Sequence, residues 1–161
     1  MSLTELPPKA PPGDRGGAGR RRPLRTPKGR QVDPRAREEI LALLTASLTP
    51  GFNAVADLWG GGVIMSDEEL SPARPVSPLD YTADLNTPLL GIFGNDDKYP
   101  TPELVNQHEA ELKKQGKNHE FHRYDGAGHG FFYWHRPLYR PEQCMDAWDK
   151  IWAFFGKHLA K

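Results

Sequence analysis

The hydrophobic positions of this chain change their spacing along its length, and each spacing is typical of one kind of element. Residues 88–94 form a continuous apolar run, the pattern of a parallel strand that is buried on both faces. Residues 54–59 predict a second short buried strand that ends at three glycines, and residues 119–124 alternate in the manner of a third strand. The pattern therefore predicts three strands.

Three further segments predict helices. Asp33 and Pro34 supply an N-cap and a first helical position, and an apolar face follows over residues 34–48. Residues 102–116 carry acidic side chains early and lysines late, which suits the helix dipole, and the last of these residues is a glycine that ends the helix. Residues 141–158 predict a helix that packs on the sheet through one apolar face: Cys144, Trp148, Ile151 and Phe155.

The order of these elements predicts the class of fold. Strands that alternate with helices are typical of an α/β domain with parallel strands and right-handed crossovers. Residues 66–87, which include three prolines, predict an ordered but irregular connection. At about 30 residues for each βαβ unit, residues 36–161 provide a sheet of three or four mostly parallel strands. Such a sheet has an open edge, so we expect self-association, aggregation or marginal stability.

The charge of the chain divides it into two parts. Residues 1–35 hold nine Lys and Arg against three Asp and Glu, and 12 of them are Pro or Gly, whereas the rest of the chain is net acidic. A segment so poor in large apolar side chains buries too little surface to offset its ordering entropy. We therefore predict a disordered basic leader over residues 1–35 and a folded domain over residues 36–161.

Composition also limits the setting and the partners. A single cysteine excludes an intramolecular disulfide framework and a cysteine-based zinc site, which suits a reducing compartment such as the cytoplasm. No apolar run is long enough to span a bilayer, so no membrane is expected as a partner. The basic leader lacks interleaved aromatic residues, so a solvated tail is favoured over nucleic-acid binding. His119 and His122 are three residues apart on a predicted strand and face opposite ways, which disfavours a metal site.

Candidate chemistry lies in the loops that follow the second and third predicted strands. Asp96 and Asp97 follow the strand 88–94, and His129 lies in a glycine-rich loop after the strand 119–124. In α/β sheets the working residues sit in loops at the carboxyl ends of the strands. An acid followed by a histidine in this chain order is the arrangement of α/β-hydrolases. The alternative for each motif alone is that Asp97 caps a turn and His129 is an ordinary loop residue.

Over roughly residues 53–160 the sequence resembles the dienelactone hydrolase family of α/β-hydrolases. The resemblance is carried by four blocks in the family order: Asp57-Leu58-Trp59-Gly60-Gly61-Gly62-Val63, residues 88–97, Tyr124-Asp125-Gly126-Ala127-Gly128-His129-Gly130-Phe131, and residues 136–141 followed by Ala147-Trp148 and Phe154-Phe155. The resemblance implies a partial α/β-hydrolase sheet. It also implies hydrolysis of a lactone or another carboxylic ester through an acyl-enzyme, with no metal and no organic cofactor. Carried over by motif, Asp97 is the triad acid and His129 the base, with Asp96 the competing choice for the acid.

The chain departs from the family at the nucleophile. Family members carry a Cys, or a Ser in some relatives, at a Gly-x-Cys/Ser-x-Gly elbow upstream of the Trp-Gly-Gly-Gly segment. No such elbow occurs here, because no serine has the flanking glycines: Ser2, Ser47, Ser66, Ser71 and Ser77. Cys144 lies after His129 on the predicted buried face of the last helix, so we interpret it as a core residue.

Two hypotheses follow from the missing elbow. The first is that the chain is the carboxyl-terminal portion of a hydrolase, with a leader that arose by truncation or an altered reading frame, and that in isolation it is inactive or very weak. The second is a non-catalytic remnant or interaction module that keeps the scaffold without the reaction.

Overall fold

The computed structural model describes residues 38–72 and 75–159, with side chains described from residue 42 onward, so the predicted leader lies outside the described residues. The elements, in chain order, are α1 (Glu38–Leu48), β1 (Val55–Leu58), the 3-10 helix η1 (Pro78–Asp84), β2 (Leu89–Gly94), α2 (Pro102–Lys114), β3 (His119–Tyr124) and α3 (Pro141–Leu159). Each strand lies within its predicted range. None of the described helices is both long and apolar enough to cross a membrane.

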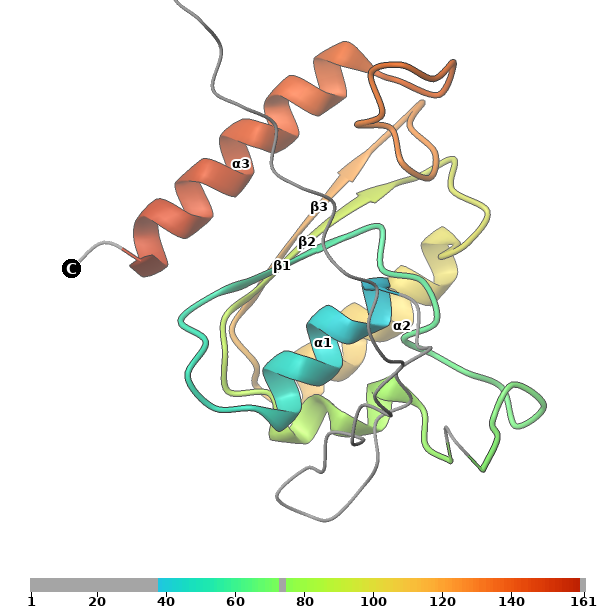
Figure 1. Cartoon of the computed structure of the whole chain (residues 1–161), viewed down its shortest axis with the longest axis vertical. Coiled ribbons are helices and arrows are strands. Elements are labelled where there is room, and N and C mark those ends of the chain that lie inside the picture. The colour runs from blue at the N-terminus through green and yellow to red at the C-terminus, as the bar shows by residue number, and fades with distance from the viewer. Residues whose placement is uncertain (1–37, 73–74, 160–161) are drawn as a thin grey trace, which may run out of the picture.

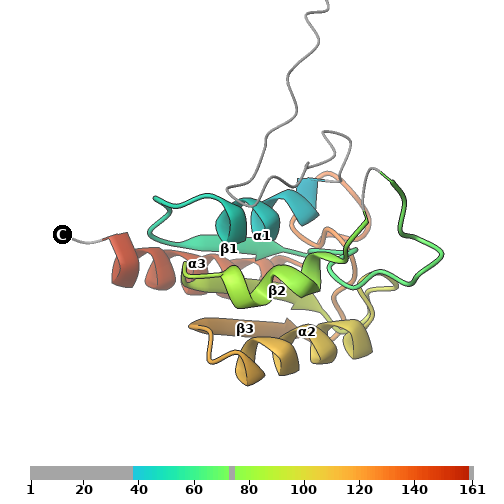
Figure 2. The same ribbon diagram turned by 90° about the horizontal axis from the view of Figure 1, so that it is seen from below.

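The three strands form one parallel sheet in the order β1-β2-β3, which confirms the predicted α/β class. Helix α3 covers one face of the sheet, and α1, α2 and η1 lie on the other face (Figures 1 and 2). All six residues of the central strand β2 are buried, as its continuous apolar run predicts. The carboxyl ends of all three strands point to the same edge, where the loops with Asp97 and His129 begin.

Alternate residues of the strands build two separate cores. Leu90 and Ile92 face α3 and pack against its buried side chains, Cys144, Ala147, Ile151 and Phe154. Leu89 faces the other way and packs with Leu43 of α1 and Leu112 of α2. Because successive side chains of a strand point to opposite faces, one strand supplies both cores.

Two details of the predicted elements need correction. The connection over residues 66–87 is not irregular throughout, because residues 78–84 form η1, which begins at a proline. Trp148 was expected on the buried face of α3 but is 39% exposed. At 100° per residue, Ala147 completes the buried face with Cys144 and Ile151, and Trp148 lies beside that face.

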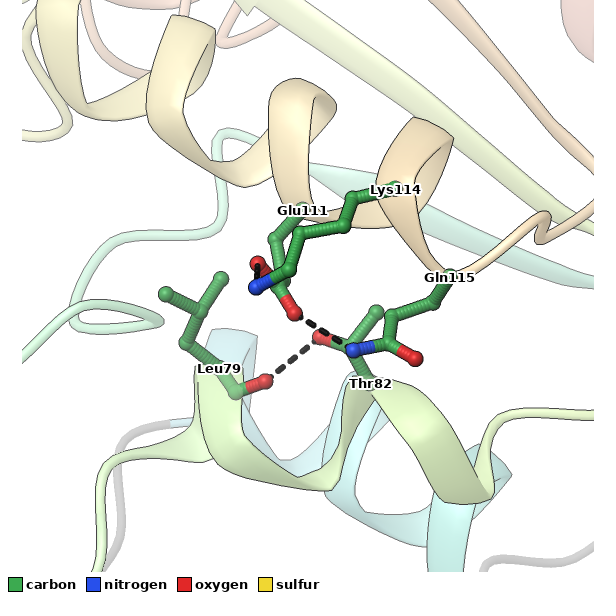
Figure 3. Close-up of polar contacts among 5 residues, drawn as sticks. All are labelled: Leu79, Thr82, Glu111, Lys114 and Gln115. Carbon is green, nitrogen blue, oxygen red and sulfur yellow. Dashed lines mark hydrogen bonds and ion pairs between the residues drawn. The ribbon is translucent and has the colours of Figure 1, made fainter.

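The carboxyl end of α2 lies over η1 (Figure 3). Glu111 accepts hydrogen bonds from Gln115 Nε2 at 2.7 Å and from Lys114 Nζ at 2.9 Å. On the facing side, Thr82 Oγ1 donates to the Leu79 carbonyl at 2.6 Å, and Lys117 Nζ, just beyond α2, donates to the Ala83 carbonyl at 2.8 Å. Of these four bonds, the one from Lys117 to Ala83 links the end of α2 to η1, and the others lie within one helical segment or the other.

His108 on α2 is expected to make stability depend on pH. It is 2% exposed, its ring lies 5.3 Å from the Phe121 ring, and burial, with the charge of His119 in addition, lowers the pKa of His108 to about 4. In the unfolded chain the pKa of histidine is about 6.5. As the pH falls, the His108 ring is therefore protonated in the unfolded chain before it is protonated in the folded chain. The stabilisation is therefore complete above pH 6.5 and is lost as the pH falls towards 4, by up to roughly 3 kcal/mol.

The measurement is the midpoint of urea unfolding at several pH values between 7 and 4.5, for the wild type and for His108→Leu. We expect His108→Leu to lose this part of the pH dependence, whereas His135→Leu, at an exposed histidine, keeps it. An unchanged pH dependence in His108→Leu would contradict the assignment.

Candidate active site

The loops after β2 and β3 are joined through their backbones. The Asn95 N–H donates to the Tyr124 carbonyl at 2.9 Å, and the Asp96 N–H donates to the Ala127 carbonyl at 2.9 Å. Gly94, the last residue of β2, lies so close to Ala127 that a Cβ there would overlap the Ala127 carbonyl. The main chain thus holds the segment with Asp97 against the segment with His129.

Asp97 and His129 meet at this junction. His129 Nδ1 lies 3.0 Å from Asp97 Oδ2, and the other carboxylate oxygen accepts the Tyr99 N–H at 2.9 Å. The Asp97 side chain is 2% exposed, whereas the His129 side chain is 45% exposed. Because a carboxylate only accepts hydrogen bonds, Nδ1 carries the hydrogen of this bond, and Nε2 is the basic nitrogen of the neutral ring.

Asp96, the competing acid, lies elsewhere. Asp96 is exposed, and its backbone N–H donates to the Ala127 carbonyl in the loop that precedes His129. The carboxylate that the His129 ring contacts is that of Asp97. The structure therefore brings together Asp97 and His129 and leaves Asp96 at the surface.

Trp59 is a site residue to which the sequence analysis gave no role. It follows β1 directly, is 8% exposed and has a positive φ of 61°, a conformation that bulky residues rarely adopt. Its ring centroid lies 6.2 Å from that of His129 and 5.1 Å from that of Phe132. Its position at the carboxyl end of a predicted strand, directly before three glycines, is the feature of the sequence that could have marked it as a site residue.

The positions of the cysteine and of two serines do not suit a nucleophile. Cys144 is 5% exposed in the core under α3, which confirms the predicted placement, and burial raises the pKa of its thiol. A neutral buried thiol is a poor nucleophile. Ser47 is buried on α1, and Ser77 Oγ donates to the Val63 carbonyl at 2.9 Å. Within residues 38–72 and 75–159, no cluster of three His, Cys, Asp or Glu side chains forms a candidate metal site.

The sequence of this chain matches a family of known proteins. The family model described as "Dienelactone hydrolase family" matches residues 40–159. A Synechocystis protein named "Putative carboxymethylenebutenolidase" is 34% identical over 74% of this chain and 46% of its own length. A Bradyrhizobium protein named "Probable 2-oxo-3-(5-oxofuran-2-ylidene)propanoate lactonase" is 28% identical over 72% of this chain and 46% of its own length.

Solved structures agree with the fold. A crystal structure titled "Putative Dienelactone Hydrolase" from Klebsiella pneumoniae superposes with a TM-score of 0.67 at 26% identity, over 73% of this chain and 47% of that chain. An acylaminoacyl peptidase of Pyrococcus horikoshii superposes with a TM-score of 0.62 at 19% identity, over 74% of this chain and 22% of that chain, which shows the fold alone. The chain spans about half the length of the Synechocystis and Bradyrhizobium relatives. From the family match over residues 40–159 together with the parallel sheet, the chain belongs to the dienelactone hydrolase family.

Proposed function

We propose that this chain supplies the acid and base of a hydrolase site for lactones or other carboxylic esters, with His129 as the base and Asp97 as the acid. The observation that carries the proposal is the 3.0 Å contact between a buried carboxylate and a half-exposed imidazole at the carboxyl edge of the sheet. The family, and the lactonase and carboxymethylenebutenolidase names of its relatives, support the class of substrate. No metal or organic cofactor is part of the proposed reaction.

The proposed chemistry follows from the two nitrogens of the ring. His129 Nε2 takes the proton of a nucleophile as that nucleophile adds to the ester carbonyl, and returns it to the alkoxide as the ester C–O bond breaks. Asp97 fixes the tautomer through Nδ1 and stabilises the imidazolium that forms between these two transfers. A second cycle with water in place of the nucleophile releases the acid.

The nucleophile is the part that the sequence does not contain, since it has no Gly-x-Cys/Ser-x-Gly elbow. This absence is also what favours the second candidate, a non-catalytic remnant or interaction module. A single cysteine allows no intramolecular disulfide, which suits a reducing compartment, and we propose the cytoplasm as the location.

A chimera tests the acid–base role directly. Residues 40–159 of this chain replace the matching segment of the Synechocystis relative, and the part of the relative that precedes this segment is kept. We expect the chimera to hydrolyse an aryl ester and a lactone. A folded chimera that hydrolyses neither substrate would reject the acid–base role and would favour the second candidate, a non-catalytic remnant or interaction module.

The isolated chain is expected to hydrolyse an activated aryl ester no faster than His129→Ala does. Without the elbow there is neither a nucleophile nor the oxyanion donor that follows it, so an acyl-enzyme does not form. The measurement is paired kinetics on wild type, His129→Ala and Cys144→Ala, with and without a thiol-directed inhibitor. A burst in the wild type that disappears in Cys144→Ala would contradict both the prediction and the core role of Cys144.

A further inference from the structure

A cavity of about 360 Å³ lies at the opposite end of the sheet from His129. It is formed by the end of α1 with the turn that follows, residues 46–52, and by a second segment that contributes Asp84, Asn86 and Thr87. These two segments precede β1 and β2, so the cavity lies at the amino ends of the strands, whereas the candidate active site lies at their carboxyl ends. Its volume is within the range of small-molecule sites.

Two side-chain donors of the cavity wall bond within the wall itself. The Thr87 hydroxyl donates to the Phe52 carbonyl at 3.3 Å and so joins the two segments. Asn86 Nδ2 donates to the Asp84 carbonyl at 3.1 Å. These bonds occupy the hydroxyl hydrogen and one amide hydrogen, and they leave the oxygen atoms of the Thr87 and Asn86 side chains as acceptors.

The end of α1 adds further acceptors. The last carbonyl groups of a helix have no partner within the helix. The Thr45 carbonyl accepts the Thr49 N–H at 2.9 Å, but no backbone N–H of the described residues bonds to the carbonyl groups of residues 46–48. The last turn of α1 also holds no basic side chain to offset the negative end of the helix dipole.

Ser47 is a buried polar residue in this wall. It is 9% exposed, and within the described part of the chain its Oγ has no hydrogen-bond partner. A buried polar atom without a partner costs about 1–3 kcal/mol. A ligand in the cavity that donates to this hydroxyl oxygen would remove that cost.

The charge of the wall is negative. Asp84 is the charged side chain among the described residues that line the cavity, and none of those residues is Lys, Arg or His. Lys117, whose Nζ donates to the neighbouring Ala83 carbonyl, is outside the lining. Phe52, which is 44% exposed, adds an aromatic ring to the wall. An aromatic ring attracts cations as well as apolar groups.

We propose that this cavity binds a small organic cation in which an ammonium group is attached to an apolar body. The ammonium group donates to the carbonyl groups at the end of α1 and pairs with the Asp84 carboxylate, and the apolar body packs on Phe52. An anion is disfavoured, because the carboxylate and the negative helix end repel it. The proposal does not depend on the hydrolase role, since the cavity shares no residue with Asp97 and His129.

The test is an NMR titration of the full chain with three probes of similar shape: benzylammonium, benzyl alcohol and benzoate. We expect benzylammonium to shift the amide signals of residues 46–52 and 84–87 until they saturate. Its affinity should be at least about tenfold higher than that of benzyl alcohol, because hydrogen bonds to charged groups are stronger than those between neutral groups. Benzoate should not shift these signals.

Two variants separate the charge from the hydroxyl. Asp84→Asn should weaken benzylammonium binding at least about tenfold, and Ser47→Ala, which keeps the size of the side chain, about threefold. Asp80→Asn is the matched control, because it makes the same chemical change in η1 at an exposed position outside the cavity. Its affinity should equal that of the wild type.

The chimera provides a second measurement, since it retains residues 40–159. There benzylammonium should raise the Tm of the unmodified protein more than that of Asp84→Asn. Equal affinities of benzylammonium and benzyl alcohol, equal effects of Asp84→Asn and Asp80→Asn, or shifts confined to the loop with His129 would each overturn the proposal. So would the absence of saturable shifts together with an unchanged Tm.

Discussion

Asp97→Asn in the chimera is expected to lower kcat for ester hydrolysis about 10⁴-fold, with little change in KM. In the wild type, Asp97 Oδ1 accepts the Tyr99 N–H while Oδ2 faces His129 Nδ1. In the variant, the amide oxygen keeps the Tyr99 bond, so the amide NH₂ faces Nδ1. Nδ1 must then accept, the proton moves to Nε2, and the ring is no longer a base for the nucleophile.

His129→Ala should cost at least as much, and the double variant little more, because the two residues act as one unit. The matched control is Asp96→Asn, which makes the same chemical change one residue earlier at an exposed position. Its kcat should equal that of the unmodified chimera. A loss in Asp96→Asn as large as that in Asp97→Asn would reject the assignment of the acid.

Gly94→Ala is expected to destabilise the chain by about 3 kcal/mol, at the upper end of the range for overpacked sites. A Cβ at Gly94 would overlap the carbonyl group of Ala127, and backbone atoms cannot rotate away as a flexible side chain would. Relief requires the β2 end and the loop with His129 to separate, which also strains the backbone bond between Asp96 and Ala127.

Gly156→Ala provides the comparison for this substitution. Gly156 lies within α3, and nothing lies within 4 Å of a Cβ placed there. That substitution should leave stability unchanged or raise it by up to about 1 kcal/mol through helix propensity. Urea denaturation of the three proteins decides the matter, and equal midpoints for Gly94→Ala and wild type would show that the two loops are not held by this contact.

The parts of the fold that could be predicted are those in which the residue pattern fits a single kind of secondary structure. The uninterrupted apolar run over 88–94 fits a strand buried on both faces, and the early acids and late lysines of 102–116 fit the helix α2. In the structure, Thr101 Oγ1 caps this helix by accepting the Leu104 N–H at 3.4 Å. The meeting of Asp97 and His129 followed from parallel strands, whose carboxyl ends share one edge.

Other features depend on contacts that no local pattern contains. Helix α3 has apolar residues around nearly half its circumference, and only the sheet decides that Ala147 is buried while Trp148 is partly exposed. In η1 the prolines suggested irregular chain, yet a first-turn proline suits a short helix that packs under α2. The left-handed backbone of Trp59 has no local signal either, and its ring packs against those of Phe131 and Phe132 from a distant part of the chain.

The backbone bonds between the loops after β2 and β3 bear on how such a site can diversify. Asn95 and Asp96 bond to carbonyls of Tyr124 and Ala127 through their N–H groups, so the separation of acid and base depends on the main chain rather than on neighbouring side chains. We therefore expect that the exposed position of Trp134 can be randomised in a selection for new substrates of the chimera while the proposed acid–base pair keeps its spacing. The site separates the residues that can vary from those that set its geometry.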